Sequence, residues 1–239
     1  MHASTISPRL FVAAPLAAGA ELAVSEAQAH HLGTVLRMRA GEAVRLFSGT
    51  DGEWLATVAE LRRGACRLAV ERQLRVQEPE PDLWLVFAPL KRDATDLVVE
   101  KATELGVSAL QPVFTERTVA GRVAGERLLA IATGAAEQCE RLSVPRLLPP
   151  LPLARLLVEW NPDRLLVAAL ERRGLPPPPA LAGRRAALLV GPEGGFTPAE
   201  LDLLLKHPLV IGAGLGARVL RAETAAIAGL ALLGIGGGG

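Results

Sequence analysis

Short apolar segments bounded by turn residues dominate the first third of the chain. Those at 9–12, 21–24, 43–49, 53–61 and 66–74 have the length and composition of β-strands. Thr50-Asp51-Gly52 lies between two of them and is a hairpin signal. One helical pattern interrupts the series: Ser25 and Gln28 make a capping box, and an apolar stripe follows that ends near Arg37 and Gly41. The pattern predicts a small, barrel-like β domain.

The pattern changes after the charged, proline-bearing segment 76–82. Continuous apolar segments are typical of strands buried on both faces, and they occur at 83–88, 109–113, 164–170, 186–190 and 209–212. Helical periodicity separates them, at 94–106 and 124–142. We therefore predict two domains, 1–75 and 76–239, the second being α/β with a mainly parallel sheet. The tetraproline 176–179 is expected to be a rigid surface connection.

Composition and charge narrow the classes of function. The 239 residues are 50% hydrophobic and carry a formal net charge of +1, which argues against a general, charge-driven coat for nucleic acid. Aromatic residues, at 3%, are too few for a stacking platform for single strands. We find neither metal-ligand spacing nor an apolar segment long enough for a bilayer. The sequence predicts a cytoplasmic protein without metal, in which Cys66 and Cys139 are inert buried thiols and His30 and His31 lie on a helix face.

The stretch LLVGPEGGFT, 188–197, joins a buried strand to a helix whose start is marked by Thr197, Pro198 and Glu200. Glycines in such a turn allow backbone amides to approach a ligand closely. The loop lacks the lysine and hydroxyl of a nucleoside triphosphate-binding loop, so triphosphate hydrolysis is disfavoured.

A second glycine cluster follows the last strand. Gly212, Gly214 and Ala217 satisfy the dinucleotide-binding spacing, but the required second strand and acidic residue do not follow. Both glycine loops come after strands of one parallel sheet, so we expect them to meet at its carboxyl edge and to share a ligand. Two alternative classes remain open. Saturable binding of NAD would support a nicotinamide dehydrogenase, and RNA binding without catalysis would support a non-enzymatic assembly factor.

Four motifs, in order, resemble those of the bacterial 16S ribosomal RNA uracil-N3 methyltransferases of the SPOUT superfamily: LVVEKATELGVSALQPVFTER, AAEQCERLSVPRL, GPEGGFTPAEL and LGARVLRAETAAIAGLALL. They cover most of the second domain, and HHLGTVLRMRAGE resembles the N-terminal PUA-like module of that family. The resemblance implies a PUA-like β-barrel that recognises RNA, followed by an α/β domain with a C-terminal trefoil knot. It also implies methylation of N3 of one uridine in the decoding region of 16S rRNA, on the assembled small subunit, by a homodimer.

The resemblance further implies that S-adenosyl-L-methionine is bound by the loops of the knot. The residues expected to bind it are Leu170, Gly191, Pro192, Glu193, Gly194, Gly195, Leu215, Gly216, Arg218, Val219, Leu220, Arg221, Thr224 and Ala225. Glu193 can equally serve its own loop as a hydrogen-bond acceptor, and Thr224 can cap the last helix.

Charged residues are the candidates for catalysis and for RNA binding. Arg221 is the candidate donor to the uracil oxygens and Glu223 the candidate base, although Glu223 can also simply start the last helix. Arg9, Arg37, Arg39 and Arg92 are candidate RNA contacts, with ordinary solvated arginines as the alternative. The alanine-rich helix 225–233 is the expected homodimer interface.

Overall fold

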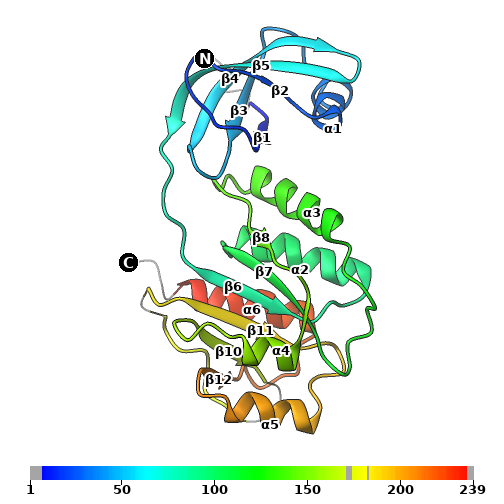
Figure 1. Ribbon diagram of the computed structural model, residues 1–239, viewed down its shortest axis with the longest axis vertical. Helices are drawn as coiled ribbons and strands as arrows, with labels where there is room; N and C mark the ends of the chain where they lie inside the picture. The colour runs from blue at the N-terminus through cyan, green and yellow to red at the C-terminus, as the bar shows by residue number, and fades with distance from the viewer. Residues whose placement is uncertain (1–6, 171–173, 182, 236–239) are drawn as a thin grey trace. The chain divides into compact units, whose positions relative to one another are not determined.

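The computed structural model describes residues 7–170, 174–181 and 183–235, which form two compact units (Figure 1). The first comprises the described residues up to Pro79 together with Ala136–Ser143, and the second comprises Glu80–Ala135 and the described residues from Val144 onward. The first unit is rich in β-strands, whereas the second combines helices with a parallel sheet. The expected fold class, a PUA-like β domain followed by an α/β domain, is confirmed; the trefoil knot remains a prediction.

A five-stranded sheet forms the first unit, in the order β1-β3-β4-β5-β2. Its strands are β1 (Arg9–Phe11), β2 (Glu21–Ala23), β3 (Ala43–Phe47), β4 (Glu53–Arg62) and β5 (Ala65–Arg75). All pairs are antiparallel except β1 with β3. The predicted hairpin joins β3 to β4. Gly52 is required there, because its φ is +77° and a Cβ would overlap the carbonyl of Arg75.

The helix expected from Ser25 to about Arg37 is present but changes type along its length. The Ser25–Gln28 capping box starts α1 (Glu26–His30) as predicted, and a π-helical segment, His31–Val35, continues it. Arg37 then has a φ of +55°, which ends the helical path. The wider turns bury Leu32 completely, while Val35 and Leu36 are exposed. The stripe therefore predicted where the helical path ends but not its π-helical second half or the exposure of Val35 and Leu36.

Arg9 anchors residues 136–143 within the β-rich unit. Its guanidinium lies 4.5 Å from the centre of the Phe47 ring and its Nε donates to Glu53 Oε1 at 2.5 Å. The remaining nitrogens donate to the carbonyls of Ala136, Glu137 and Arg141 at 2.9–3.0 Å. The Arg9 side chain is thereby almost fully buried with its donors paired.

A parallel sheet forms the second unit, in the order β12-β10-β11-β6-β7-β8, with β9 also paired to β7. Its strands are β6 (Leu83–Phe87), β7 (Ala109–Phe114), β8 (Arg146–Leu147), β9 (Leu151–Pro152), β10 (Leu165–Ala169), β11 (Ala186–Val190) and β12 (Val210–Ala213). The helices are α2 (Arg92–Glu104), α3 (Gly125–Gln138), α4 (Leu153–Val158), α5 (Pro198–Lys206) and α6 (Ala222–Ile235). The two-residue strands β8 and β9 and the short helix α4 were not predicted.

Both faces of this sheet are buried, as its continuous apolar strands predict. Leu188 of β11 packs into the core that contains residues of α2 and α6, whereas its neighbour Leu189 packs with residues of α4 and α5. Consecutive strand residues point to opposite faces, so an unbroken apolar segment places helices on both sides. Gly229 lets α6 approach β11, because a Cβ there would lie 2.7 Å from Leu188 Cδ2.

An ion pair between the buried Arg164 and the partly exposed Asp82 joins the starts of β6 and β10. Arg164 Nη2 donates to Asp82 Oδ2 at 2.6 Å, and its guanidinium stacks 3.9 Å from the centre of the Trp84 ring. Burial by itself raises the pKa of Asp82. The hydrogen bond and charge of Arg164, together with hydrogen bonds from Ser108 and Trp84, outweigh burial and hold that pKa below its ordinary value.

Candidate functional site

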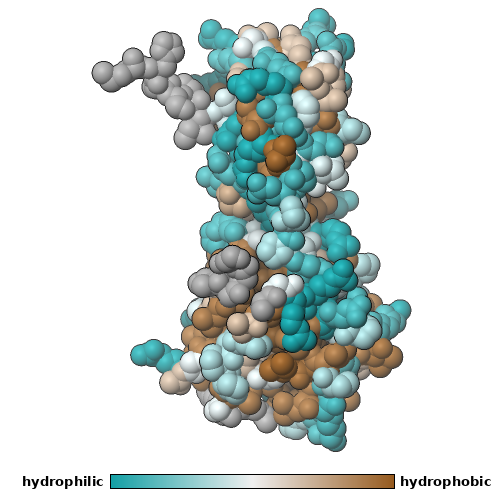
Figure 2. Space-filling model, turned by 90° about the vertical axis from the view of Figure 1, so that its left-hand side faces the viewer, coloured by the Kyte–Doolittle hydropathy of each residue, from teal (hydrophilic) through white to brown (hydrophobic). Residues whose placement is uncertain are grey.

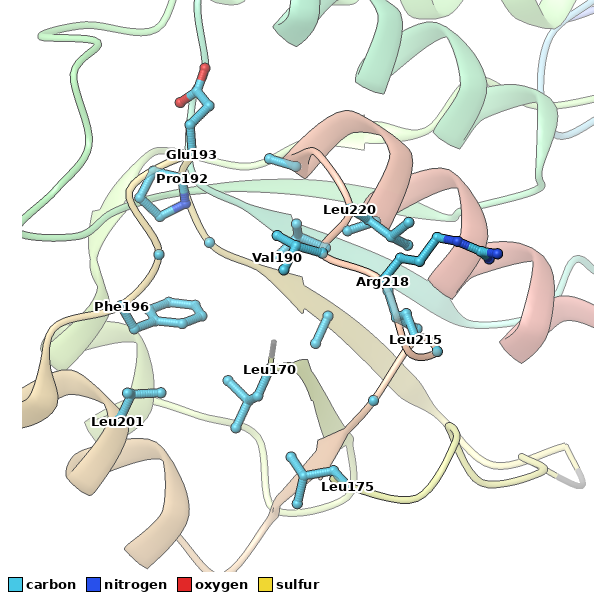
Figure 3. A pocket seen from close by; sticks show the side chains of 18 of the residues that line it. Leu170, Leu175, Val190, Pro192, Glu193, Phe196, Leu201, Leu215, Arg218 and Leu220 are labelled. Atoms are coloured by element: carbon cyan, nitrogen blue, oxygen red, sulfur yellow. The ribbon is translucent and has the colours of Figure 1, made fainter. Parts of the chain in front are cut away.

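A cavity of about 550 Å³ lies where β10, β11 and β12 end (Figure 3). These strands are neighbours with β10 in the middle, so the connections that follow them meet at the carboxyl edge of the sheet. The three connections contribute most of the lining, and Leu201 of α5 with Ala222 and Ala225 of α6 complete it. The expectation that both glycine loops share one site is therefore confirmed, and the connection after β10 is a third wall.

The loop after β11 follows its expected course from strand to helix. Gly191 is buried, and a Cβ there would lie 2.9 Å from the ring of Phe196, which lines the same cavity. Gly195 has a φ of +67° and donates its N–H to the carbonyl of Pro192 at 2.8 Å, which closes a turn. Thr197 then caps α5 with Glu200 in a capping box and Pro198 in the first turn, as predicted. The glycines thus serve both close packing and turn geometry.

The loop after β12 packs against the proline-rich connection that follows β10. The N–H of Gly214 donates to the carbonyl of Pro176 at 2.8 Å, and a Cβ on Gly214 would lie 2.7 Å from the carbonyl oxygen of Leu175. Leu175 itself lines the cavity. The tetraproline segment is a surface connection, as expected, but its first residue also fixes a wall of the site.

Charged and apolar side chains occupy different parts of the cavity. Leu170, Leu201 and Phe196 form an apolar side (Figure 3). The side chains of Glu193 and Arg218 are exposed and extend away from those three residues. The cavity therefore suits a ligand with an apolar portion and charged or polar ends.

All but two of the residues expected to bind cofactor line this cavity; the exceptions are Arg221 and Thr224. Both are exposed, Arg221 immediately before α6 and Thr224 within its first turn, where it is not the capping residue. Glu223 is half-buried in the same turn and also lies outside the lining. The candidate catalytic pair therefore follows the cavity wall in sequence without forming part of it.

Several lining residues were not predicted. They are Ala169, Gly174, Leu175, Val190, Phe196 and Leu201, whereas Gly214, Ala217 and Ala222 belong to the second glycine loop and its helix start, which were expected at the site. Phe196 and Val190 flank the glycine loop directly, and that adjacency was a usable signal. Leu175 carried none, because only the folded structure brings its connection against Gly214.

Of the four arginines expected to contact RNA, one was predicted wrongly and three remain predictions. Arg9 is buried and its donors are satisfied by protein groups, so it is a structural residue and not an RNA contact. Arg37, Arg39 and Arg92 are exposed. The expectation of two buried thiols also fails in part: Cys66 is buried, but Cys139 is exposed.

No cluster of three potential metal-binding side chains occurs in the part of the chain that the structure describes. Over the same ranges, none of the helices is both long and apolar enough to cross a bilayer. His30 ends α1 and His31 begins the π-helical segment; both are exposed.

Comparison with models of known families identifies the class of protein. Residues 77–234 match a family model described as an RNA methyltransferase domain, and residues 24–71 match one described as an RNA methyltransferase PUA domain. These matches fall on the α/β sheet with its cavity and on the β-rich unit. The chain therefore belongs to the RNA methyltransferases.

Full-length relatives define the family. The chain is 32% identical to the ribosomal RNA small subunit methyltransferase E of Rickettsia conorii, over 93% of each chain. It is also 32% identical to the Synechocystis protein of that name, over 93% of this chain and 76% of the relative. The chain belongs to the ribosomal RNA small subunit methyltransferase E family.

Solved structures extend the likeness to the cofactor of the family. A Legionella pneumophila methyltransferase with the cofactor S-adenosylmethionine bound has a TM-score of 0.85 and 30% identity, with 97% of this chain and 98% of that chain covered. The Neisseria gonorrhoeae ribosomal RNA small subunit methyltransferase E bound to S-adenosylmethionine also has a TM-score of 0.85, with 28% identity over 94% and 95% of the two chains. The cofactor prediction is confirmed at the level of these neighbours.

Proposed function

We propose that this protein transfers a methyl group from S-adenosylmethionine to N3 of one uridine in the decoding region of 16S rRNA, on the assembled small subunit. The observation that carries the proposal is the cavity at the carboxyl edge of the sheet, within a chain whose structural neighbours hold S-adenosylmethionine. Domain 1–75 would then recognise RNA, and domain 76–239 would bind the cofactor and transfer the methyl group.

The residues of the cavity fit this cofactor. Its volume of about 550 Å³ lies within the range of small-molecule sites. Added Cβ atoms at Gly191 and Gly214 would lie 2.9 Å from the Phe196 ring and 2.7 Å from the Leu175 carbonyl oxygen, so these glycines allow the cavity wall to pack closely. Leu215, Val219 and Leu220 would pack the adenine, and the exposed Glu193 and Arg218 are suited to the charged methionyl end.

When bound, the cofactor supplies an electrophilic methyl carbon on a sulfonium. The protein must align uridine N3 with that carbon and favour loss of the N3 proton. Arg221 follows the cavity wall directly and is our candidate donor to the uracil oxygens, which stabilises the uracil anion. Glu223, in the first turn of α6, is the candidate proton acceptor.

RNA and a second copy of the chain are the proposed macromolecular partners. Arg37, Arg39 and Arg92 are exposed and permanently charged, as phosphate contacts require. For the homodimer, Val219 and Leu232 are each 49% exposed at the two ends of the α6 region, and residues 225–235 carry no polar side chain. Figure 2 shows more apolar surface on the α/β unit than on the β-rich unit. We expect the homodimer to act in the cytoplasm.

The test is transfer of tritium from labelled S-adenosylmethionine to small ribosomal subunits that lack uridine N3 methylation, with the product nucleoside identified by mass. We expect 3-methyluridine at one position. Label in another nucleoside would refute the assignment to N3 and leave the methyltransferase class intact. Cofactor binding without any transfer would leave the cofactor site intact and refute the proposed substrate. RNA binding with no methyl transfer would favour an assembly factor, and saturable binding of NAD alone would favour a dehydrogenase.

A further inference from the structure

The turn Thr115–Thr118 follows β7 and is closed by its own hydrogen bonds. The N–H of Thr118 donates to the Thr115 carbonyl at 3.1 Å, and the N–H of Thr115 donates to Thr118 Oγ1 at 2.9 Å. Thr115 is buried, whereas Arg117 at the tip is exposed. The turn is therefore a defined platform at the carboxyl end of a central strand, and none of its residues lines the cavity.

Arg117 reaches from this turn to the glycine loop of the cavity. Its Nη1 donates to the carbonyl of Gly194 at 2.8 Å and lies 3.5 Å from the carbonyl of Phe196. The aliphatic stem packs on the same residue, because a Cβ on Gly194 would lie 3.3 Å from Arg117 Cδ. One side chain thus contacts the loop by charge-assisted hydrogen bonding and by packing.

A second bond joins the same turn to the same loop independently. Glu200 of α5 is 5% exposed; its Oε2 accepts from the Thr197 N–H, and its Oε1 accepts from the N–H of Glu116, each at 2.8 Å. Adjacent residues 116 and 117 therefore hold the loop at its helix end and at its middle. Such paired attachment is typical of a segment that must keep one conformation.

We propose that Arg117 is a positioning residue for the cofactor cavity. Arg117 does not itself line the cavity; it acts through Gly194 and Phe196, two residues that do. That the ligand is S-adenosylmethionine rests on the function proposed above. That Arg117 restrains the loop follows from its contacts with Gly194 and Phe196, whatever the ligand is.

The physical reason is preorganisation. Two consecutive glycines give the segment 194–195 large conformational freedom when nothing restrains it. Because a mobile loop must be ordered when ligand binds, any contact that orders it beforehand strengthens binding. Arg117 supplies that contact at the two carbonyls that flank Gly195.

The experiment compares the wild-type chain with Arg117→Ala, Arg117→Lys and the control Arg122→Ala. Arg122 is exposed in the same connection, and no contact of its side chain is seen among the described residues. Arg122→Ala therefore removes one positive charge from this connection without removing a contact. Hydrogen exchange of the loop amides is measured without ligand, S-adenosylmethionine affinity by calorimetry, and methyl transfer by steady-state kinetics. For Arg117→Ala we expect faster exchange over 194–197 and about 3- to 10-fold weaker affinity, with kcat within about twofold. Lysine should restore part of the affinity.

Several outcomes would overturn the inference. Unchanged exchange and affinity in Arg117→Ala would show that the contacts do not order the loop. An equal loss in Arg122→Ala would assign the effect to positive charge. If the wild-type protein fails to bind S-adenosylmethionine, the proposed function fails, and the exchange comparison still decides whether Arg117 holds the loop.

Discussion

At the scale of single residues, the glycine loop shows that neighbouring glycines meet different needs. Gly191 leaves room for the ring of Phe196, Gly194 for the stem of Arg117, and Gly195 adopts a φ of +67°. Only the last is a matter of backbone conformation. The other two are steric, so their replacement should disturb the particular neighbour that each one faces.

Gly191→Ala should displace the Phe196 ring from the cavity wall. Overpacking of this kind costs about 1–3 kcal/mol, and we expect roughly 10-fold weaker S-adenosylmethionine binding by calorimetry. Gly121→Ala is the control, because nothing lies within 4 Å of its added Cβ. Wild-type affinity in Gly191→Ala would mean that the ring adjusts without cost to the site.

Arg221→Ala separates cofactor binding from chemistry. Arg221 lies outside the cavity lining, so S-adenosylmethionine affinity should stay at the wild-type value. Loss of a donor to the developing anion should lower kcat for uridine methylation by about 100- to 1,000-fold. Arg218→Ala, in the lining, should instead weaken affinity; wild-type turnover in Arg221→Ala would remove its assigned role.

At the scale of elements, the small size of Gly229 allows α6 to pack closely against β11. The added Cβ of Gly229 would lie 2.7 Å and 3.1 Å from the two terminal carbons of Leu188, which is completely buried. Gly229→Ala should therefore lower the free energy of unfolding by about 1–2 kcal/mol, despite the better helix propensity of alanine.

Gly134→Ala, within α3, is the matched control. Gly134 is exposed and nothing lies within 4 Å of its added Cβ, so the same change should raise the free energy of unfolding by about 0.5–1 kcal/mol. Urea denaturation of both variants measures the contrast. Stabilisation of both would show that α6 can move away from the sheet at little cost.

The elements that the sequence predicted are those that one local pattern determines. The long apolar strands, the Thr197 cap of α5 and the Gly52 turn follow from hydrophobic periodicity and turn chemistry, and each is present. The short elements β8, β9 and α4 depend on pairing with β7 or packing on neighbours, which no local pattern records. The glycine loops of the site were predictable because a local pattern marks them. The roles of Leu175 and Arg117 were missed because they depend on contacts between distant segments.

At the scale of the whole molecule, acid stability should depend on Asp82. Its folded-state pKa lies below the ordinary value, so the Asp82–Arg164 pair stabilises the fold above about pH 4 and its contribution is lost as pH falls through the lowered pKa. Asp82→Asn should cost about 1 kcal/mol at pH 7, a modest figure because the carboxyl is partly exposed. Unfolding in urea from pH 7 down to pH 3 should show the difference between the two proteins shrinking; a constant difference would contradict the pair's role.

The contacts of Arg9 also join parts of the first unit that are synthesised at different times. Its three carbonyl partners lie at residues 136, 137 and 141, so the N-terminal unit lacks them while the ribosome has made only the first 79 residues. Domains usually fold as units in the order of their synthesis. Here the first unit is complete only when more than half of the chain has been made, because residues 136–143 belong to it. A nascent fragment that ends before residue 136 lacks the three carbonyls that accept hydrogen bonds from Arg9.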